Sequence, residues 1–254
     1  FNFGNNYRTY EHNYANKYSN YPSGQAYKNS NTYYDYTFDN IVNYNGTFGK
    51  HDIGATFVYG ASRRKYSYTG AEAKNFARLT LGFNSLEQGK EQYVNSDAWK
   101  SSLLYQMFRI NYKFDNRYLV TATVRRDGFS GFAANNKFAT FPSVALGWVA
   151  SEEKWFKVSW VDYLKLRAGY GVSGNQTNRY SSQARVNSSI SYIFGNGATS
   201  GVLGQELTSL GNADLKWEKT AGFNFGLDFT LLGNRLQGTF EAYKTTTRDL
   251  LFDV

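Results

Sequence analysis

Apolar and polar residues alternate one by one along several segments of this 254-residue chain. Alternation with a period of two is typical of a β-strand with water on one face and an apolar phase on the other. In the clearest segment, one face carries Ala221, Phe223, Phe225, Leu227 and Phe229, and the other carries Gly222, Asn224, Gly226 and Asp228. The pattern predicts eight strands, at roughly 34–48, 52–61, 103–114, 118–127, 141–149, 164–171, 221–229 and 236–247.

The connections between these predicted strands alternate between short and long. Tight hairpin signals occur at Gly49-Lys50, at 115–117 and at Gly233-Asn234. About a dozen residues join 141–149 to 164–171, and there Ser151 is the expected N-cap of one short helical turn. Long connections are expected at roughly 4–31, 62–100, 128–140 and 172–214.

In an antiparallel meander, this order puts all short turns at one end and all long loops at the other. Outer-membrane barrels have short periplasmic turns and long extracellular loops. A two-sheet sandwich gives no reason for such an order. The sequence therefore predicts an all-β fold, an antiparallel transmembrane β-barrel meander.

Composition agrees with a barrel wall. Aromatic residues make up 19% of the chain, and proline occurs only twice. The chain has no run of 18 apolar residues that could cross a bilayer as a helix. The mean hydropathy of −0.56 fits a barrel, because only every second strand residue meets lipid.

Cysteine is absent, which excludes disulfide and thiolate chemistry. The net charge of +8 is scattered, so we expect a solvated rim and no nucleic-acid partner.

Charged and amide residues gather on one side of the predicted strands. They are Arg125, Asp127, Lys165, Arg167, Asn224 and Asp228. This side is expected to face a water-filled lumen, and the aromatic side to face lipid. Tyr118, Trp148 and Trp217 are candidates for the aromatic girdles at the membrane interfaces, and ordinary packed aromatics are the equal alternative.

Motifs that would indicate an enzyme do not fit their context. Gly169 to Gly174 matches G-x-G-x-x-G, but a polar loop follows instead of a helix. Glu152 and Glu153 are adjacent, so they cannot face each other as a paired acid and base. His12 and His51 are far apart and lack ligand spacing. We therefore expect no catalytic residue, no cofactor and no metal site.

The first long connection is rich in tyrosine, interleaved with Asn and Ser. Its tyrosines are Tyr7, Tyr10, Tyr14, Tyr18, Tyr21, Tyr27, Tyr33 and Tyr34. Such a surface suits sugars or peptides, through ring stacking and hydrogen bonds, although a loop packed on itself is the favoured interpretation. Trp99 and the segment Tyr192-Ile193-Phe194 are open to the same two interpretations.

Several segments resemble the SusC/RagA family of TonB-dependent outer-membrane transporters. The similar motifs are RYLVTATVRRDG at 117–128, FPSVALGW at 141–148 followed by Ser151-Glu152-Glu153, LKLRAGYGVSGNQ at 164–176, NADLKWEKT at 212–220, NRL at 234–236 and TRDLL at 247–251. Ala213 stands where the family pattern has proline. The similarity covers roughly 101–254, and 32–59 resembles an earlier family hairpin more loosely.

The resemblance implies a plug domain inside a barrel of about 22 strands. It also implies a SusD-like surface lipoprotein as partner, energy from the TonB complex, and import of oligosaccharides or peptides. The implied location is the outer membrane of a Gram-negative, Bacteroidetes-like bacterium. We expect residues 1–254 to be a partial transmembrane β-barrel domain, an internal piece without signal peptide, plug or TonB-contact segment.

The candidate substrate-binding residues follow from this topology, with lumen-facing or loop polar groups preferred. They are Arg125, Asp127, Arg167, Asn175, Gln176, Trp99 and Tyr192. Two alternatives stay open: a complete, closed eight-stranded outer-membrane barrel, and a surface glycan-binding β module supported by the tyrosine-rich connection.

Overall fold

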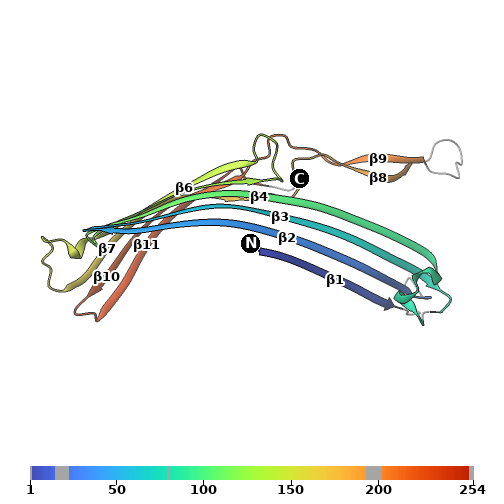
Figure 1. Cartoon of the computed structure of the whole chain (residues 1–254), viewed down its shortest axis with the longest axis horizontal. Helices are drawn as coiled ribbons and strands as arrows, with labels where there is room; N and C mark the ends of the chain where they lie inside the picture. The colour runs from blue at the N-terminus through green and yellow to red at the C-terminus, as the bar shows by residue number, and fades with distance from the viewer. Residues whose placement is uncertain (1, 15–22, 79, 193–201, 252–254) are drawn as a thin grey trace. The chain divides into compact units, whose positions relative to one another are not determined.

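The computed structural model describes residues 2–14, 23–78, 80–192 and 202–251 (Figure 1). These residues form eleven β-strands and three short 3₁₀ turns. The elements are β1 Asn2–Tyr14, β2 Gln25–Phe48, β3 His51–Phe76, η1 Gly82–Asn84, η2 Leu86–Gln88, β4 Gly89–Phe114, β5 Tyr118–Phe129, β6 Phe138–Val149, η3 Ala150–Glu152, β7 Val161–Asn175, β8 Arg185–Tyr192, β9 Val202–Ser209, β10 Glu218–Leu231 and β11 Leu236–Arg248. Within the described ranges, no helix has the length and apolarity needed to cross a membrane.

Nine strands form one sheet in the order β1-β2-β3-β4-β5-β6-β7-β10-β11, and β8 and β9 form a hairpin of their own. The chain divides into two compact units. Unit 1 comprises 1–38 and 61–102, and unit 2 comprises 39–60 and 103–254. In the described sheet β1 and β11 are the two edges, so the closed eight-stranded alternative is not supported.

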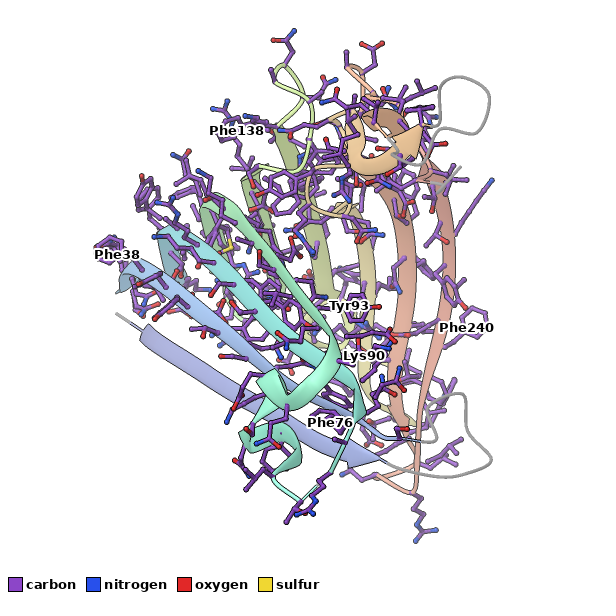
Figure 2. The ribbon with its side chains drawn as sticks, turned by 90° about the vertical axis from the view of Figure 1, so that its right-hand side faces the viewer. Phe38, Phe76, Lys90, Tyr93, Phe138 and Phe240 are labelled. Atoms are coloured by element: carbon purple, nitrogen blue, oxygen red, sulfur yellow. The ribbon has the colours of Figure 1, made fainter. Side chains whose placement is uncertain are left out.

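The predicted alternation is confirmed by the strand register of unit 2. Val144 pairs with Tyr170, Tyr170 with Phe223, and Phe223 with Lys244. We call the side that carries Val144, Tyr170 and Phe223 the apolar face, and the opposite side the polar face. On the apolar face, Leu146 is 52% exposed. Phe240, which projects from β11 on the same face, is 60% exposed (Figure 2). Large apolar side chains exposed in a continuous band indicate a surface that meets lipid.

The predicted placement of the tight turns at one end is confirmed, but strict alternation in length is not, because 150–160 at that end is longer than 130–137 at the other end. The tight turns lie at 49–50, 115–117 and 232–235, and 150–160 joins β6 to β7 at the same end. Asp115 and Asn116 both have positive φ, of 50° and 56°, which are values that Asp and Asn tolerate better than most residues. We call this the turn end, and the opposite end the loop end.

The prediction of eight strands was too low. All eight are present, but β1, β8 and β9 occupy segments predicted as loops, and β2, β3 and β4 extend well into the predicted loops 4–31 and 62–100. The tyrosine-rich connection is therefore mostly strand, with Tyr18 and Tyr21 outside the described residues. These extensions carry polar residues at both parities, so their alternation is weak and the pattern does not reveal them.

Two small apolar clusters lie beside long connections, one in each unit. In unit 1, Ala26, Ala73 and Phe76 are buried, with Phe83 and Leu86 packed against them. In unit 2, the loop-end core consists of Phe129, Phe132, Ala139, Phe141 and Trp217.

The girdle prediction for Trp217 was wrong. Its side chain is 3% exposed and packs against Phe132 and Phe141, with ring centroids 4.8 and 5.5 Å away. Trp217 therefore matches the alternative of a packed aromatic. Tyr118 and Trp148 lie at the turn end of the apolar face, where a girdle is expected.

Candidate substrate-facing surface

The polar face of unit 2 carries a first ionic cluster around β5. The Nε atom of Arg125 donates to both carboxylate oxygens of Asp127, at 2.9 and 2.8 Å. Its guanidinium also lies 5.1 Å from the ring centroid of Tyr105, whose hydroxyl donates to Asp39. Asp127 is only 9% exposed, so this carboxylate is held in place by its cation. The structure thus brings together two of the predicted site residues.

A second ionic cluster spans three neighbouring strands, β7, β10 and β11. Arg167 donates to both oxygens of Asp228 at 2.8 and 2.9 Å, and to Glu241 at 2.9 Å. Thr239 donates to Asp228 at 3.1 Å. Gly226 is the cross-strand partner of Arg167, and a Cβ there would come within 2.8 Å of the guanidinium carbon. The glycine therefore leaves room for the arginine to cross β10 and reach β11.

Smaller polar contacts continue the same face toward the turn end. Arg109 donates to Thr123 at 3.1 Å, Thr121 to Asn111 at 2.9 Å, and Lys113 pairs with Asp52 at 2.8 Å. The face is thus a surface of paired charges and amides, as predicted for a water-filled lumen.

Unit 1 holds an aromatic group around Trp99. The ring of Trp99 lies 5.3 Å from that of Tyr66 at an interplanar angle of 30°, and Tyr66 lies 4.8 Å from Tyr33. The Tyr66 hydroxyl donates to Asn31 at 2.7 Å. Trp99 was predicted as a loop residue, but it lies inside β4. Rings with an amide beside them offer stacking faces and hydrogen bonds together.

The other candidate residues lie apart from these clusters. Asn175 ends β7 and donates to Glu218 at 3.5 Å, and Gln176 follows it. Tyr192 ends β8, and its hydroxyl donates to the Gln205 carbonyl at 3.3 Å. Ile193 and Phe194 lie outside the described residues.

The sequence-based candidates missed the partners that hold the clusters together, chiefly Glu241, Tyr105 and Tyr66. A signal for Glu241 was present in the sequence. The tight turn at Gly233-Asn234 sets the register of the β10–β11 hairpin, in which Gly226 pairs with Glu241. Glu241 therefore falls on the same face as Arg167, which pairs with Gly226 from the other side.

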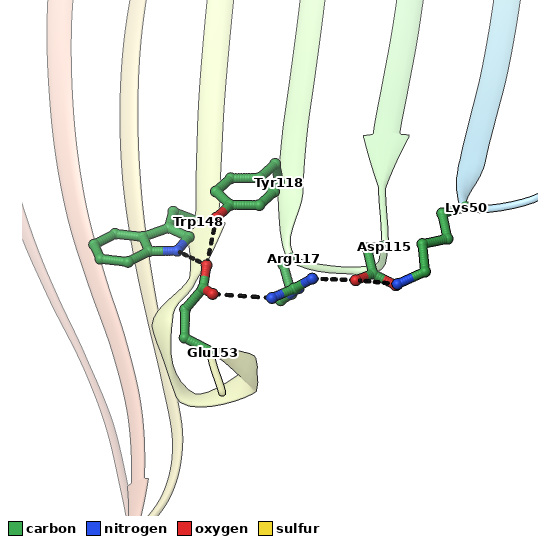
Figure 3. Close-up of polar contacts among 6 residues, drawn as sticks. All are labelled: Lys50, Asp115, Arg117, Tyr118, Trp148 and Glu153. Atoms are coloured by element: carbon green, nitrogen blue, oxygen red, sulfur yellow. Dashed lines mark hydrogen bonds and ion pairs between the residues drawn. The ribbon is translucent and has the colours of Figure 1, made fainter. Parts of the chain in front are cut away.

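A separate hydrogen-bonded cluster lies at the turn end, centred on Glu153 (Figure 3). The Tyr118 hydroxyl and the Trp148 indole N–H donate to Glu153 at 2.5 and 3.0 Å, and Arg117 donates to it at 2.9 Å. Arg117 also donates to Asp115, and Lys50 reaches that carboxylate at 3.0 Å. We call these six residues the turn-end cluster.

The turn-end cluster shifts the titration of its carboxyl groups. The Tyr118 and Trp148 hydrogen bonds, aided by Arg117, hold the pKa of Glu153 below its ordinary value. Lys50 and then Arg117 lower the pKa of Asp115 in the same way. Both carboxylates are thus ionised across the neutral range.

The prediction for Ser151 was wrong. The turn after β6 is the 3₁₀ turn η3, its N-cap residue is Val149, and no side chain caps it. The Ser151 hydroxyl is buried without a hydrogen-bond partner. Within the described ranges, no three His, Cys, Asp or Glu side chains are grouped so as to hold a metal ion.

An open antiparallel sheet with one exposed apolar face, one ion-paired polar face, and turns segregated from loops defines a transmembrane β-barrel wall. Comparison with known proteins gives the same class. The family described as "TonB dependent receptor-like, beta-barrel" matches residues 1–254. The chain belongs to this family, and it lies in the outer membrane.

Individual relatives agree. TonB-dependent receptor P39 of Formosa agariphila is 36% identical over 228 residues, covering 88% of this chain and 21% of that protein. TonB-dependent receptor SusC of Bacteroides thetaiotaomicron is 33% identical over 231 residues, covering 87% and 22%. A structure of the RagAB peptide transporter superposes with a TM-score of 0.82 at 28% identity, covering 98% of this chain and 28% of that one. The chain thus spans about a fifth of the length of these curated relatives.

Proposed function

We propose that this chain forms part of the barrel wall of a TonB-dependent importer that takes oligosaccharides or peptides across the outer membrane. The observation that carries the proposal is the division between the two faces of unit 2. Arg125, Asp127 and Arg167 are ion-paired on the polar face, while Phe223 and Phe240 are exposed on the apolar face. A polar lumen inside a lipid-facing wall is what passage of a hydrophilic solute requires.

Two groups of side chains suit the two substrate classes. The paired charges of the Arg125 and Arg167 clusters suit the charged termini and side chains of peptides. The stacked Tyr66 and Trp99 rings, with the tilted Tyr33 ring next to them, suit the apolar faces of sugar rings, and Asn31 lies beside them for a sugar hydroxyl. Asn175, Gln176 and Tyr192 lie at strand ends or beyond them, so we propose that they contact substrate outside the barrel.

The proposed importer works with partners that lie outside this chain. A SusD-like surface lipoprotein would deliver substrate to the loop end. The TonB complex would supply energy through a plug domain. The similar RagAB protein is a peptide transporter, which favours peptides as one of the two classes to test.

A surface glycan-binding module is the weaker alternative. It has the aromatic group of unit 1 in its favour. However, a water-soluble module would cover its apolar side with a second sheet. Among the described residues of unit 2, the apolar face is exposed instead.

Growth of a strain lacking the gene would test the proposed function. We expect the strain to lose growth on either an oligosaccharide mixture or a peptide mixture as sole carbon source, and to grow normally on glucose. Restoring the gene should restore growth, but only in cells with a working TonB complex. Unchanged growth on both mixtures, or rescue without TonB, would contradict the proposal.

Variants of the candidate residues connect this phenotype to the chain. If the substrate is an oligosaccharide, Trp99→Ala should lower uptake about 5- to 30-fold, the range for losing a main contact residue. Trp99→Phe keeps a stacking ring and serves as the matched control. If the substrate is a peptide, Arg167→Ala should lower uptake more than Trp99→Ala does, because it removes the cation shared by Asp228 and Glu241.

A further inference from the structure

The charges of the β10–β11 hairpin are separated by face. The register is regular from Lys219↔Arg248 to Leu231↔Leu236, so alternation assigns each side chain to a face. The cations Lys219, Lys244 and Arg248 fall on the apolar face with Phe223. The acids of these two strands, Glu218, Asp228 and Glu241, fall on the polar face. All strand cations of this hairpin therefore point to the lipid side, without an acid beside them.

Two of these cations face each other directly. Lys219 and Arg248 are cross-strand partners, and like charges in that arrangement repel. The nearby Asp249 lies beyond the strand and pairs with Lys216 at 2.9 Å. Within the described ranges, no ion pair is formed by Lys219, Lys244 or Arg248. An anion from outside the chain would relieve this repulsion.

An apolar groove of about 500 Å³ lies beside the same cations on unit 2. Its lining includes the larger Leu146, Tyr170 and Phe223, and Lys244 at one side. It also includes Phe225, which pairs with the small Ala168 on one side and with the small Ala242 on the other. The Tyr170 and Phe223 rings lie 4.7 Å apart. Lys244 pairs with Phe223, so one cation lies next to the groove while Lys219 and Arg248 lie further toward the loop end.

We propose that this surface binds a phosphorylated lipid of the outer leaflet. One acyl chain lies in this groove against the Phe223 and Phe225 rings, and the phosphate contacts Lys244 and the Lys219–Arg248 pair. The loop end is the extracellular end of an outer-membrane barrel, so the cations lie at the level of outer-leaflet headgroups. The combination of an apolar groove with unpaired cations at its headgroup end matches an anionic lipid, whereas a neutral lipid would leave the cations unpaired.

Native mass spectrometry of the protein purified from the outer membrane tests this site. The probe is lipid A, a bisphosphorylated glycolipid, titrated into the protein in a neutral detergent. The variant Lys219→Gln/Lys244→Gln/Arg248→Gln should bind lipid A about 100-fold more weakly, because each cation near a headgroup contributes about fivefold. Dephosphorylated lipid A should bind the unmodified protein about as weakly.

The matched control removes three exposed cations at the turn end. It is Lys154→Gln/Lys157→Gln/Arg235→Gln, which changes the net charge equally and should bind lipid A as the unmodified protein does. Ala242→Phe fills the groove without changing any charge, and it should also weaken binding. Equal loss in both triple variants would show non-specific charge attraction and overturn the proposal. Unchanged binding in the loop-end triple variant, or full displacement by millimolar inorganic phosphate, would overturn it as well.

Discussion

Replacing Trp217 with alanine is expected to open the loop-end core of unit 2. Trp217 is 3% exposed and Phe132 is 1% exposed, so both rings are withdrawn from water. The Trp217 indole N–H also donates to the Lys137 carbonyl at 2.9 Å, which ties the start of β10 to the β5–β6 connection. Removing a buried Trp side chain costs about 3–5 kcal/mol. We therefore expect the free energy of opening this core to fall by about that amount.

Hydrogen exchange of the Ala133 amide is a suitable reporter, because this N–H donates to the Leu215 carbonyl across the same core. In Trp217→Ala the exchange should accelerate by about two to three and a half orders of magnitude, since each factor of ten corresponds to about 1.4 kcal/mol. Trp217→Phe keeps the packing and loses the indole hydrogen bond, so its cost should be about 1 kcal/mol.

Leu210→Ala is the control for the Trp217 series. Leu210 is 80% exposed in the connection before β10, and its replacement should change the free energy of opening by less than about 0.5 kcal/mol. If Trp217→Ala exchanged at the rate of this control, the loop-end core would not hold the β5–β6 connection.

The faces and turns of unit 2 could be predicted from sequence because each depends on local residues. Alternation in 221–229 fixes which side chains share a face, and Gly233-Asn234 fixes the register of the next strand. Arg167 and Asp228 were therefore correctly assigned to one side of the sheet. Their direct contact could not be predicted from the sequence. It depends on the pairing of β7 with β10, which are separated in the chain by the long connection that contains β8 and β9.

The polar strand extensions and the buried Trp217 depend on tertiary context instead. In 62–76 polar residues occur at both parities, so no period distinguishes this strand from a loop. Trp217 lies just outside a strand, where alternation makes no statement about burial. Its packing depends on Phe132 and Phe141, which come from a different connection and strand.

Replacing Glu153 is expected to loosen the turn end. Glu153 accepts hydrogen bonds from Tyr118, Trp148 and Arg117, so Glu153→Ala leaves three donors without their acceptor. The Val149 amide, which donates to the Arg117 carbonyl at 2.8 Å, reports on the cluster. Its hydrogen exchange should accelerate by at least about tenfold in Glu153→Ala, and less in Glu153→Gln, whose amide oxygen still accepts.

Replacement of Glu152, the exposed neighbour, is the matched control. Equal exchange in Glu152→Ala and Glu153→Ala would contradict the role of Glu153.

Acid should have the same effect as the substitution, and the sign follows from the lowered pKa of Glu153. A carboxyl group whose pKa is lower in the folded state stabilises that state above its ordinary pKa, here 4.5, and the stabilisation is lost as the pH falls through the lowered value. Protection of the Val149 amide should therefore fall below pH 4.5. Asp115, with an ordinary pKa of 3.8 and a shift in the same direction, adds a second loss at lower pH. In Glu153→Gln the first loss should disappear and the second should remain, because Lys50 and Arg117 still hold Asp115. A profile of the same shape in both proteins would place the acid sensitivity outside the turn-end cluster.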